Sequence, residues 1–396
     1  MEGLFPHAAP YVGYVYPNET DIPWNTLIVI YPYITGLVAG AFIVSSFYHV
    51  FRMPQFKPIA RFALLTALCF LLFAPTPLLF HLGRPERAFN AVITPHWTSA
   101  MAAFGYVAGF YLLVLVLEVW FAFRVDIVAR SKATEGPLRL FYRALTLGSD
   151  DVSQQTLAHD HKWARALAII GIPSAAGLHG YVGFIFGSLK SREWWASDLM
   201  PIIFLLSAIV SGVALLVVLY VVVSRIRKVR LEEDCLRGLA NAMWAFLIVV
   251  LVVEGLEFVE IVYKAKEGVE TIMQLVKGPI WPSLAVQVLG SAVALAVLTV
   301  LIAFKTQGRN FVVWLTISAV LLMIAVLAMR WNVVIGGQEL SKTMKGLLTY
   351  EPVFFGREGM LSSLLLLAGP FFALWIAARL LPPWEEGSHA YRAQGL

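Results

Sequence analysis

An apolar run that begins at Ile59 ends in the stretch Phe80-His81-Leu82-Gly83-Arg84-Pro85-Glu86-Arg87. This stretch puts a histidine and two arginines where lipid would give way to water. A purely structural explanation is open, because proline stops a helix, glycine frees the backbone and arginine favours the headgroup region. A functional explanation depends on what the other apolar runs carry at the same depth.

The composition places the chain in a membrane. Of its 396 residues, 59% are hydrophobic and 14% are charged, and its mean hydropathy is +0.75. A soluble domain carries about 25% charged residues, so this chain has too few to cover a surface in water. The net charge of +5 is spread among the loops and does not indicate a nucleic-acid partner.

Repeated apolar runs of about 20 residues predict helices rather than a barrel. We expect an all-α integral membrane protein with about nine transmembrane helices. Their predicted ranges are 25–50, 59–80, 97–123, 163–189, 199–223, 238–263, 280–304, 310–330 and 356–381.

The basic residues predict the orientation. With the N-terminus outside, 19 of the 30 Lys and Arg residues fall in cytoplasmic segments, as the positive-inside rule favours. Residues 1–24 then form a periplasmic segment, for which we expect no cleavable signal peptide because it lacks a basic start and a short apolar core. Residues 382–396 form a cytoplasmic tail.

A faint repeat predicts the division of the membrane domain, residues 25–381. Thr35 to Gly40 reads Thr-Gly-Leu-Val-Ala-Gly, and Ser207 to Gly212 reads Ser-Ala-Ile-Val-Ser-Gly, four spans later and in the same direction. Small residues at this spacing let helices pack closely. We therefore expect two four-helix bundles, residues 25–189 and 199–330, and one extra helix, residues 356–381. Chance similarity between helices rich in small residues is the alternative.

Ionisable residues inside spans are costly and are usually paired or functional. Those predicted in the outer half are His81, His179, Glu254, Glu257, Glu260 and Arg330, with Tyr181 beside them. Their shared depth on several helices predicts a polar pocket. The alternatives are that His179 is a packed histidine bonded to a carbonyl group and that Glu260 lies at the interface.

The inner half carries fewer such residues. His49 lies near the inner end of the first span, and Glu118 lies near the inner end of the third. One explanation is that Glu118 pairs with Arg124. The functional explanation is a proton path that starts near Glu118 or His49 and ends near Glu254.

Histidines and carboxylates beside an apolar cleft suit quinone chemistry, because quinone reduction needs two protons as well as two electrons. Cys69 and Cys235 form no Cys-x-x-Cys pair, so we expect no iron–sulfur cluster and no metal site in this chain. We also expect no haem, since His81 and His179 are the only histidine pair predicted at one depth. A transporter or an ion or proton channel is the alternative function, although transporters more often show inverted repeats.

Three stretches resemble one known family. They are Pro23-Trp24, the run from His81-Leu82-Gly83-Arg84-Pro85 to Asn90, and Leu199-Met200-Pro201 with the Phe204 to Ala208 segment. They resemble the NrfD/PsrC family, the membrane subunits of polysulfide reductase and related complexes. The segment from Arg330-Trp331-Asn332 to Gln338 is similar to the QrcD/HybB branch of that family.

The resemblance implies a haem-free, quinone-binding subunit of a menaquinone-reducing complex in the bacterial inner membrane. It implies electrons from a periplasmic iron–sulfur subunit, in a complex with a multihaem cytochrome c and a molybdopterin-family subunit. Together with the charge map, it predicts two sets of residues. The quinone-binding set is His81, Arg84, His179, Tyr181, Glu254 and Glu257, and the partner-docking set is Arg84, Arg87, Arg330 and Gln338.

Overall fold

The computed structural model describes residues 22–263 and 268–384, and this part of the chain contains helices but no strand. Eight helical segments in it are long and apolar enough to cross a membrane. These are α1 (Thr26–His49), the run Pro54–His81 that contains α2 (Lys57–Phe73) and α3 (Thr76–His81), α5 (Ala100–Ala133), α7 (Gln154–Gly187), α8 (Met200–Arg227), α11 (Trp281–Ala303), the run Gly308–Glu339 that begins with α12 (Gly308–Trp331), and α14 (Met360–Leu380).

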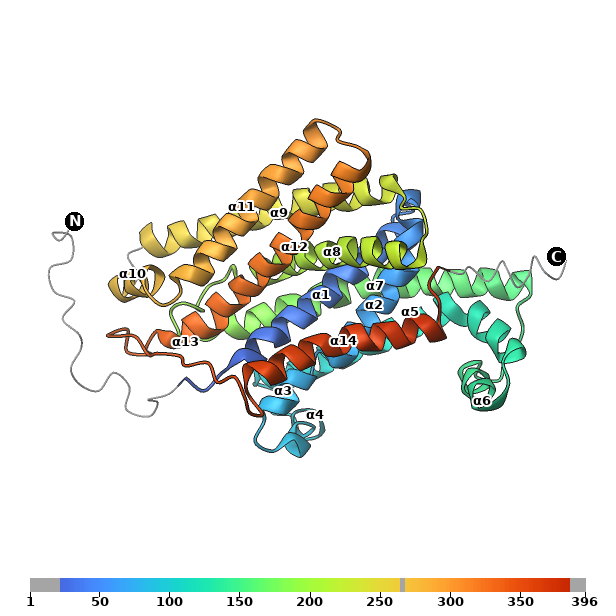
Figure 1. Cartoon of the computed structure of the whole chain (residues 1–396). Coiled ribbons are helices and arrows are strands. Elements are labelled where there is room, and N and C mark those ends of the chain that lie inside the picture. The colour runs from blue at the N-terminus through green and yellow to red at the C-terminus, as the bar shows by residue number, and fades with distance from the viewer. Residues whose placement is uncertain (1–21, 264–267, 385–396) are drawn as a thin grey trace.

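A further long helix, α9 (Glu233–Tyr263), packs against α8 and α11 and covers the predicted span 238–263. The prediction of an all-α integral membrane protein with about nine spans is therefore confirmed. The long helices lie side by side (Figure 1). Short helices mark the two ends of the bundle: α10 (Val269–Lys277) lies at one end and α6 (Gly136–Leu145) at the other (Figure 1). We call these the α10 end and the α6 end.

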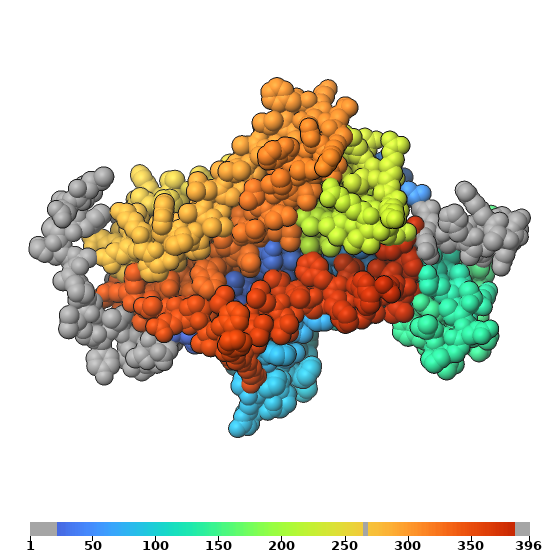
Figure 2. Space-filling model, in the orientation of Figure 1, coloured from blue at the N-terminus to red at the C-terminus, as the bar shows by residue number. Residues whose placement is uncertain are grey.

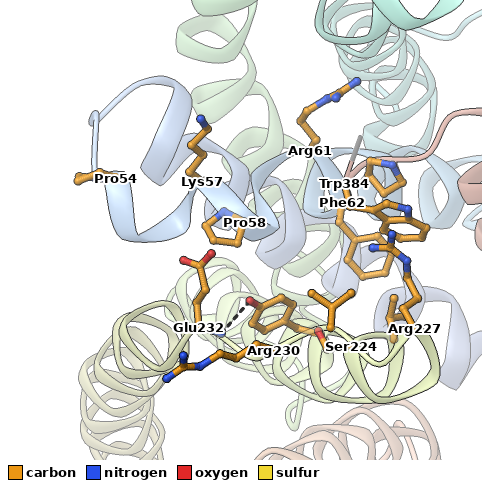
Figure 3. Close-up of a pocket in the computed structure, with 14 residues that line it drawn as sticks. Pro54, Lys57, Pro58, Arg61, Phe62, Ser224, Arg227, Arg230, Glu232 and Trp384 are labelled. Atoms are coloured by element: carbon orange, nitrogen blue, oxygen red, sulfur yellow. Dashed lines mark hydrogen bonds between the residues drawn. The ribbon is translucent and has the colours of Figure 1, made fainter. Parts of the chain in front are cut away.

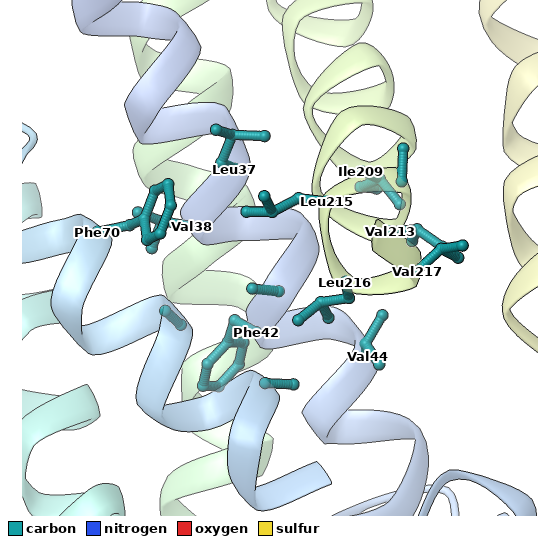
Figure 4. Close-up of a cluster of buried hydrophobic side chains, with 14 of the residues drawn as sticks. Leu37, Val38, Phe42, Val44, Phe70, Ile209, Val213, Leu215, Leu216 and Val217 are labelled. Carbon is teal, nitrogen blue, oxygen red and sulfur yellow. The ribbon is translucent and has the colours of Figure 1, made fainter. Parts of the chain in front are cut away.

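Helix α1 forms the centre of the molecule. It packs against α2, α7, α8 and α12, and its side chains are almost all buried. Figure 4 shows Leu37 and Phe42 of α1 with Phe70 of α2 on one side and Leu215 and Leu216 of α8 on the other. Because apolar residues surround α1 on every face, it is a helix buried in protein. In contrast, α11 and α14 leave much of their apolar surface exposed, as helices that face lipid do.

The two repeat motifs meet at their last glycines. Both α1 and α8 run from the α10 end toward the α6 end (Figure 1). A Cβ atom built on Gly40 would lie 2.6 Å from the Cα atom of Gly212, and one built on Gly212 would lie 2.5 Å from the Cα atom of Gly40. Only glycine at both positions lets the two backbones approach this closely.

The remaining long helices pack around this pair. Helix α5 packs against α7, and α11 packs against α12, while α14 lies against α2. The predicted span 59–80 is interrupted at Ala74-Pro75, where α2 ends and α3 begins. Proline lacks the N–H that would continue the α2 ladder, and the Thr76 hydroxyl donates instead to the Phe73 carbonyl at 2.6 Å. This break sets the direction of the short helix that ends in His81.

Two helices extend beyond their predicted ranges at the α6 end. Helix α5 continues to Ala133 and α7 already begins at Gln154. The Arg124 guanidinium donates to the Asp160 carboxylate at 2.7 Å and joins these extensions. The pair lets charged residues continue both helices where the sequence predicted a loop.

After α12 the chain makes a π-helical turn, Asn332–Gly336, buried at the α10 end. Its carbonyl groups are not left unpaired. The indole N–H of Trp194 donates to the Asn332 carbonyl at 3.0 Å, and that of Trp195 donates to the Val333 carbonyl at 2.5 Å. Such single π turns occur often at functional sites.

Candidate functional site

His81 lies in a polar cluster built from three distant segments. Asn25 is the N-cap of α1, and its side-chain oxygen accepts a hydrogen bond from the Leu27 N–H at 2.9 Å. Its amide nitrogen donates to Glu358, in the segment before α14, and lies 3.4 Å from His81 Nδ1. His81 Nδ1 is 3.3 Å from the Glu358 carboxylate. The cluster therefore offers an amide, an imidazole and a carboxylate side by side.

A cavity of about 280 Å³ opens beside this cluster. Pro23, Asn25, Tyr350 and Glu358 are among the residues that line it, with apolar Val353 and Phe355. Burial raises the pKa of the Tyr350 hydroxyl, which keeps it protonated at neutral pH and able to donate a hydrogen bond. The cavity thus combines apolar walls with a few converging polar groups, the usual character of small-molecule sites.

A second polar cluster surrounds Arg330 of α12. Arg330 is 0% exposed, and its guanidinium donates to the Ser207 hydroxyl at 2.9 Å and to the Phe204 carbonyl at 3.2 Å. The guanidinium also lies 3.9 Å from the centre of the Phe204 ring. The Nε atom of Arg330 is buried without a hydrogen-bond partner. A buried cation with an unpaired donor is costly, so this arginine is a functional candidate.

His179 of α7 lies on the other side of Phe204, with ring centres 6.4 Å apart. It is 0% exposed, and both of its ring nitrogens are buried without a hydrogen-bond partner. The backbone of α1 makes room for the ring at Gly36, where an added Cβ would lie 3.3 Å from it. The alternative that His179 is a packed histidine bonded to a carbonyl group is not what the structure has.

Glu254 of α9 belongs to this region and interacts electrostatically with Arg330. It accepts a hydrogen bond from Gln287 of α11 at 3.1 Å, and Gln287 accepts one from Asn332 at 2.8 Å. Asn332 in turn accepts one from the Ser283 hydroxyl. A chain of hydrogen bonds thus runs from the carboxylate of Glu254 to the buried π turn at the α10 end.

The two clusters are separate. His81 meets α1 at Asn25, whereas His179 meets it at Gly36, about 16 Å further along the helix. The structure brings together His179, Arg330 and Glu254 but does not bring His81 to them. Tyr181 also points elsewhere, because its hydroxyl donates to the Ala100 carbonyl of α5 at 2.9 Å. Glu257 lies one turn beyond Glu254 on the half-buried side of α9.

The residues predicted for docking divide into two groups. Arg84 and Arg87 are exposed in the segment after α3, which projects from the bundle together with α4 (Asn90–Ile93), as the light blue knob in Figure 2 shows. Arg330 and Gln338 are only 0% and 1% exposed. Gln338 accepts from the Trp24 N–H at 3.0 Å and donates to the Val334 carbonyl at 3.0 Å. These two residues hold the fold together, so including them in a docking surface was wrong.

At the α6 end, Glu118 is 2% exposed and its Oε2 atom has no hydrogen-bond partner. The expected alternative, a pair with Arg124, is not formed, because Arg124 binds Asp160 and the carbonyl groups of Ser149 and Asp151. His49 lines a cavity of about 760 Å³ that opens at this end, and its Nε2 atom is also buried without a partner.

Sequence reasoning missed four residues of these clusters: Asn25, Gln287, Asn332 and Glu358. Asn25 had a detectable signal, because asparagine directly before an apolar run is a common N-cap. Glu358 had none, since nothing in a loop sequence shows that it reaches a histidine 277 positions earlier. Among the residues that the structure describes, no group of three or more His, Cys, Asp or Glu side chains could hold a metal ion.

Comparisons with known proteins agree on one family. The family model of polysulphide reductase, NrfD, matches residues 15–341. The C subunit of selenate reductase from Mesobacillus selenatarsenatis is 33% identical over 318 residues, which are 79% of this chain and 73% of that protein. The Hdr-like menaquinol oxidoreductase integral membrane subunit of Archaeoglobus fulgidus is 25% identical over 324 residues, 80% of this chain and 71% of that protein. Protein NrfD of Escherichia coli is 26% identical over 202 residues, 49% of this chain and 58% of that protein.

Proposed function

Because the chain belongs to the NrfD family of polysulphide reductase membrane subunits, we propose that it is the quinone-binding subunit of a respiratory oxidoreductase complex. In this proposal it is free of haem and passes electrons from an iron–sulfur partner to menaquinone. The Archaeoglobus relative named as a menaquinol oxidoreductase subunit supports the choice of quinone. The relatives named as reductase subunits favour this redox role over a transporter or channel.

The observation that carries the proposal is the cluster of Asn25, His81 and Glu358 beside the 280 Å³ cavity. Small-molecule sites begin at about 300 Å³, so this cavity suits a quinone ring but not its long isoprenoid tail. Phe354 and Phe355 are exposed next to the cavity and give the tail an apolar path to lipid. The residues present therefore fit a quinone headgroup.

Menaquinone would supply the redox chemistry by taking up two electrons and two protons. His81 would donate a hydrogen bond to a quinone carbonyl oxygen and so hold the ring in place. Glu358, 3.3 Å from His81 Nδ1, would exchange a proton with the imidazole and reset it for the next turnover. Asn25 would orient the carboxylate through the hydrogen bond that it already donates.

We propose that the electron donor docks on the projecting segment that carries Arg84 and Arg87. These arginines are exposed and directly follow the helix that ends in His81, which keeps the electron path short. The charge map favours the periplasm for this side. The proposed partners there are an iron–sulfur subunit, a multihaem cytochrome c and a molybdopterin-family subunit.

We further propose that protons enter from the α6 end. His49 lines the large cavity there, and Ser45 lies one turn deeper on α1. On α5, Phe121 lines the same cavity, Glu118 lies about one turn deeper and Tyr111 two turns beyond that. Ser45, His49, Tyr111 and Glu118 each bury a polar atom that has no hydrogen-bond partner. Such atoms are costly unless water or a transferred proton uses them.

The test of the quinone site is the substitution His81→Ala in the assembled complex. Loss of the hydrogen bond to the quinone should lower quinone turnover by roughly 100-fold, while the complex still assembles and its other redox centres stay intact. His96→Ala is the matched control, because His96 is exposed in the same projecting region and bonds only Thr98. Unchanged quinone turnover in the His81 variant would exclude this site.

A further inference from the structure

A second cavity at the α6 end lies outside the proposed quinone and proton sites. It has a volume of about 470 Å³ and lies between the start of α2 and the end of α8. Figure 3 shows Lys57, Pro58, Arg61 and Phe62 opposite Ser224 and Arg230, with Trp384 at the side. The cavity therefore joins three parts of the chain that are far apart in sequence.

Basic residues dominate its polar lining. Arg61 is neutralised by its ion pair with Asp126. Lys57, Arg227 and Arg230 remain, and Glu232 is the only acidic residue among the described residues that line the cavity. Three cations against one anion favour an anionic ligand. Lys57 also begins α2, a helix of 17 residues whose N-terminal N–H groups add partial positive charge.

One of these cations is held in place by an aromatic ring. The Arg227 guanidinium lies 3.9 Å from the centre of the Trp384 ring, and Figure 3 shows the two side chains together beside Phe62. Stacking of this kind orders an arginine while leaving its N–H donors in the ring plane available. A planar fork of donors matches the oxygens of a phosphate group.

The walls and the surroundings of the cavity are apolar. Pro58, Phe62, Val223 and Trp384 line it. Next to it, α8 exposes Val222 and Ile226, the latter to 75%. A ligand with a phosphate in the cavity could therefore lay acyl chains along this surface. The start of α2 and the end of α8 are also the ends of two membrane-spanning segments, which is the level of lipid headgroups.

We propose that this cavity binds the phosphate group of an anionic phospholipid. Basic pockets between transmembrane helices on the cytoplasmic side are suited to such headgroups. A bound lipid would link α2 to the end of α8 and to the segment around Trp384. It would thereby stabilise the α6 end of the bundle. Inorganic phosphate shares the charge but lacks the chains, so the two ligands can be distinguished.

The experiment uses the full-length chain in detergent, titrated with phosphatidylglycerol, phosphatidylcholine or inorganic phosphate. Binding is followed by the thermal unfolding midpoint and by mass spectrometry of retained lipid. Phosphatidylglycerol should raise the midpoint, and the other two ligands should not. The double variant Lys57→Gln/Arg230→Gln should bind phosphatidylglycerol about 30-fold more weakly. Both residues are exposed, so the variant should fold.

The control is Arg139→Gln/Arg143→Gln on α6, which removes the same charge at the same end but outside the cavity. This variant should bind phosphatidylglycerol as the wild type does. Equal weakening in both double variants would show only general attraction to anionic lipid and overturn the proposal. An equal effect of inorganic phosphate would overturn it too, since the site would then recognise a free anion.

Discussion

Asp151 shows how a single exposed side chain fixes the start of a long helix. It lies just before α7, and its carboxylate accepts hydrogen bonds from the Thr156 hydroxyl at 2.6 Å and the Ser153 N–H at 2.8 Å. These bonds hold the pKa of Asp151 below its usual value. A group with a lowered folded pKa stabilises the fold above its unfolded pKa, about 3.9, and this stabilisation is lost as the pH falls through the folded pKa.

We therefore predict that Asp151→Asn loosens the first turn of α7 at neutral pH. Amide hydrogen exchange in residues 153–157 should become faster than in the wild type. The difference should vanish in acid, below the folded pKa, where the wild-type carboxyl is protonated as well. Asp150→Asn changes the neighbouring carboxyl, for which no contact is found, and should leave exchange unchanged. Equal exchange in all three proteins at pH 7 would contradict the capping role.

At this scale the sequence predicted residue types better than their partners. It singled out Glu118 and Arg124 as a possible pair, but positions i and i+6 lie on different faces of a helix. Arg124 therefore turns to Asp160 on α7, and Glu118 is left in the interior. His81 was found as a candidate, whereas Asn25 and Glu358 were not, because their contacts with it depend on tertiary packing.

At the scale of helices, the contact between Gly40 and Gly212 sets the distance between α1 and α8. We predict that Gly40→Leu forces the two backbones apart and destabilises the protein by roughly 1 to 3 kcal/mol. Reversible unfolding in mixed detergent micelles would measure the change. Gly109→Leu on α5 is the control, since an added Cβ there meets nothing within 4 Å. A Gly40 variant as stable as this control would show that the helices separate without cost.

The projecting segment after α3 gives a second prediction at this scale. In Arg84→Glu/Arg87→Glu, the reversed charges should repel an acidic partner surface and lower the yield of the iron–sulfur subunit in co-purification several-fold. The comparison variant is Arg139→Glu/Arg143→Glu, which makes the same change on α6 at the opposite end. If both variants retain the partner equally well, docking lies elsewhere.

The sequence predicted the helices well because apolar length alone decides them. It could not show the break at Pro75, since one proline is tolerated in many membrane helices, and α1 itself contains Pro32. It also placed His81 and His179 at one depth. His179 lies eight residues before the end of α7 at Gly187, about 12 Å, whereas His81 ends its own helix. The two-bundle division and the assignment to the QrcD/HybB branch stay predictions.

For the whole molecule, the proposed electron and proton entries lie at opposite ends, so turnover should move charge across the membrane. Moving one elementary charge through 100 mV involves about 2.3 kcal/mol. We predict that the reconstituted complex generates a membrane potential during quinone reduction and that Glu118→Gln abolishes it. A potential-sensitive dye in sealed vesicles would measure this.

Glu135→Gln is the matched control for that experiment. Glu135 is an exposed carboxylate at the same end, just before α6, and its variant should retain the potential. Turnover without any potential in the wild type would mean that protons enter from the same side as electrons. The quinone site could then still be correct, because the His81 variant tests it independently.

The burial of α1 has a consequence for biosynthesis. This helix leaves the ribosome first, yet one of its main partners, α8, ends about 180 residues later. At a synthesis rate of about 5 to 20 residues per second, α1 waits roughly 10 to 35 s for that partner. During this interval Gly36, Gly40 and the surfaces around them face lipid or an insertion chaperone. Translation errors or pauses within the second half of the chain should therefore expose the first helix to membrane proteases.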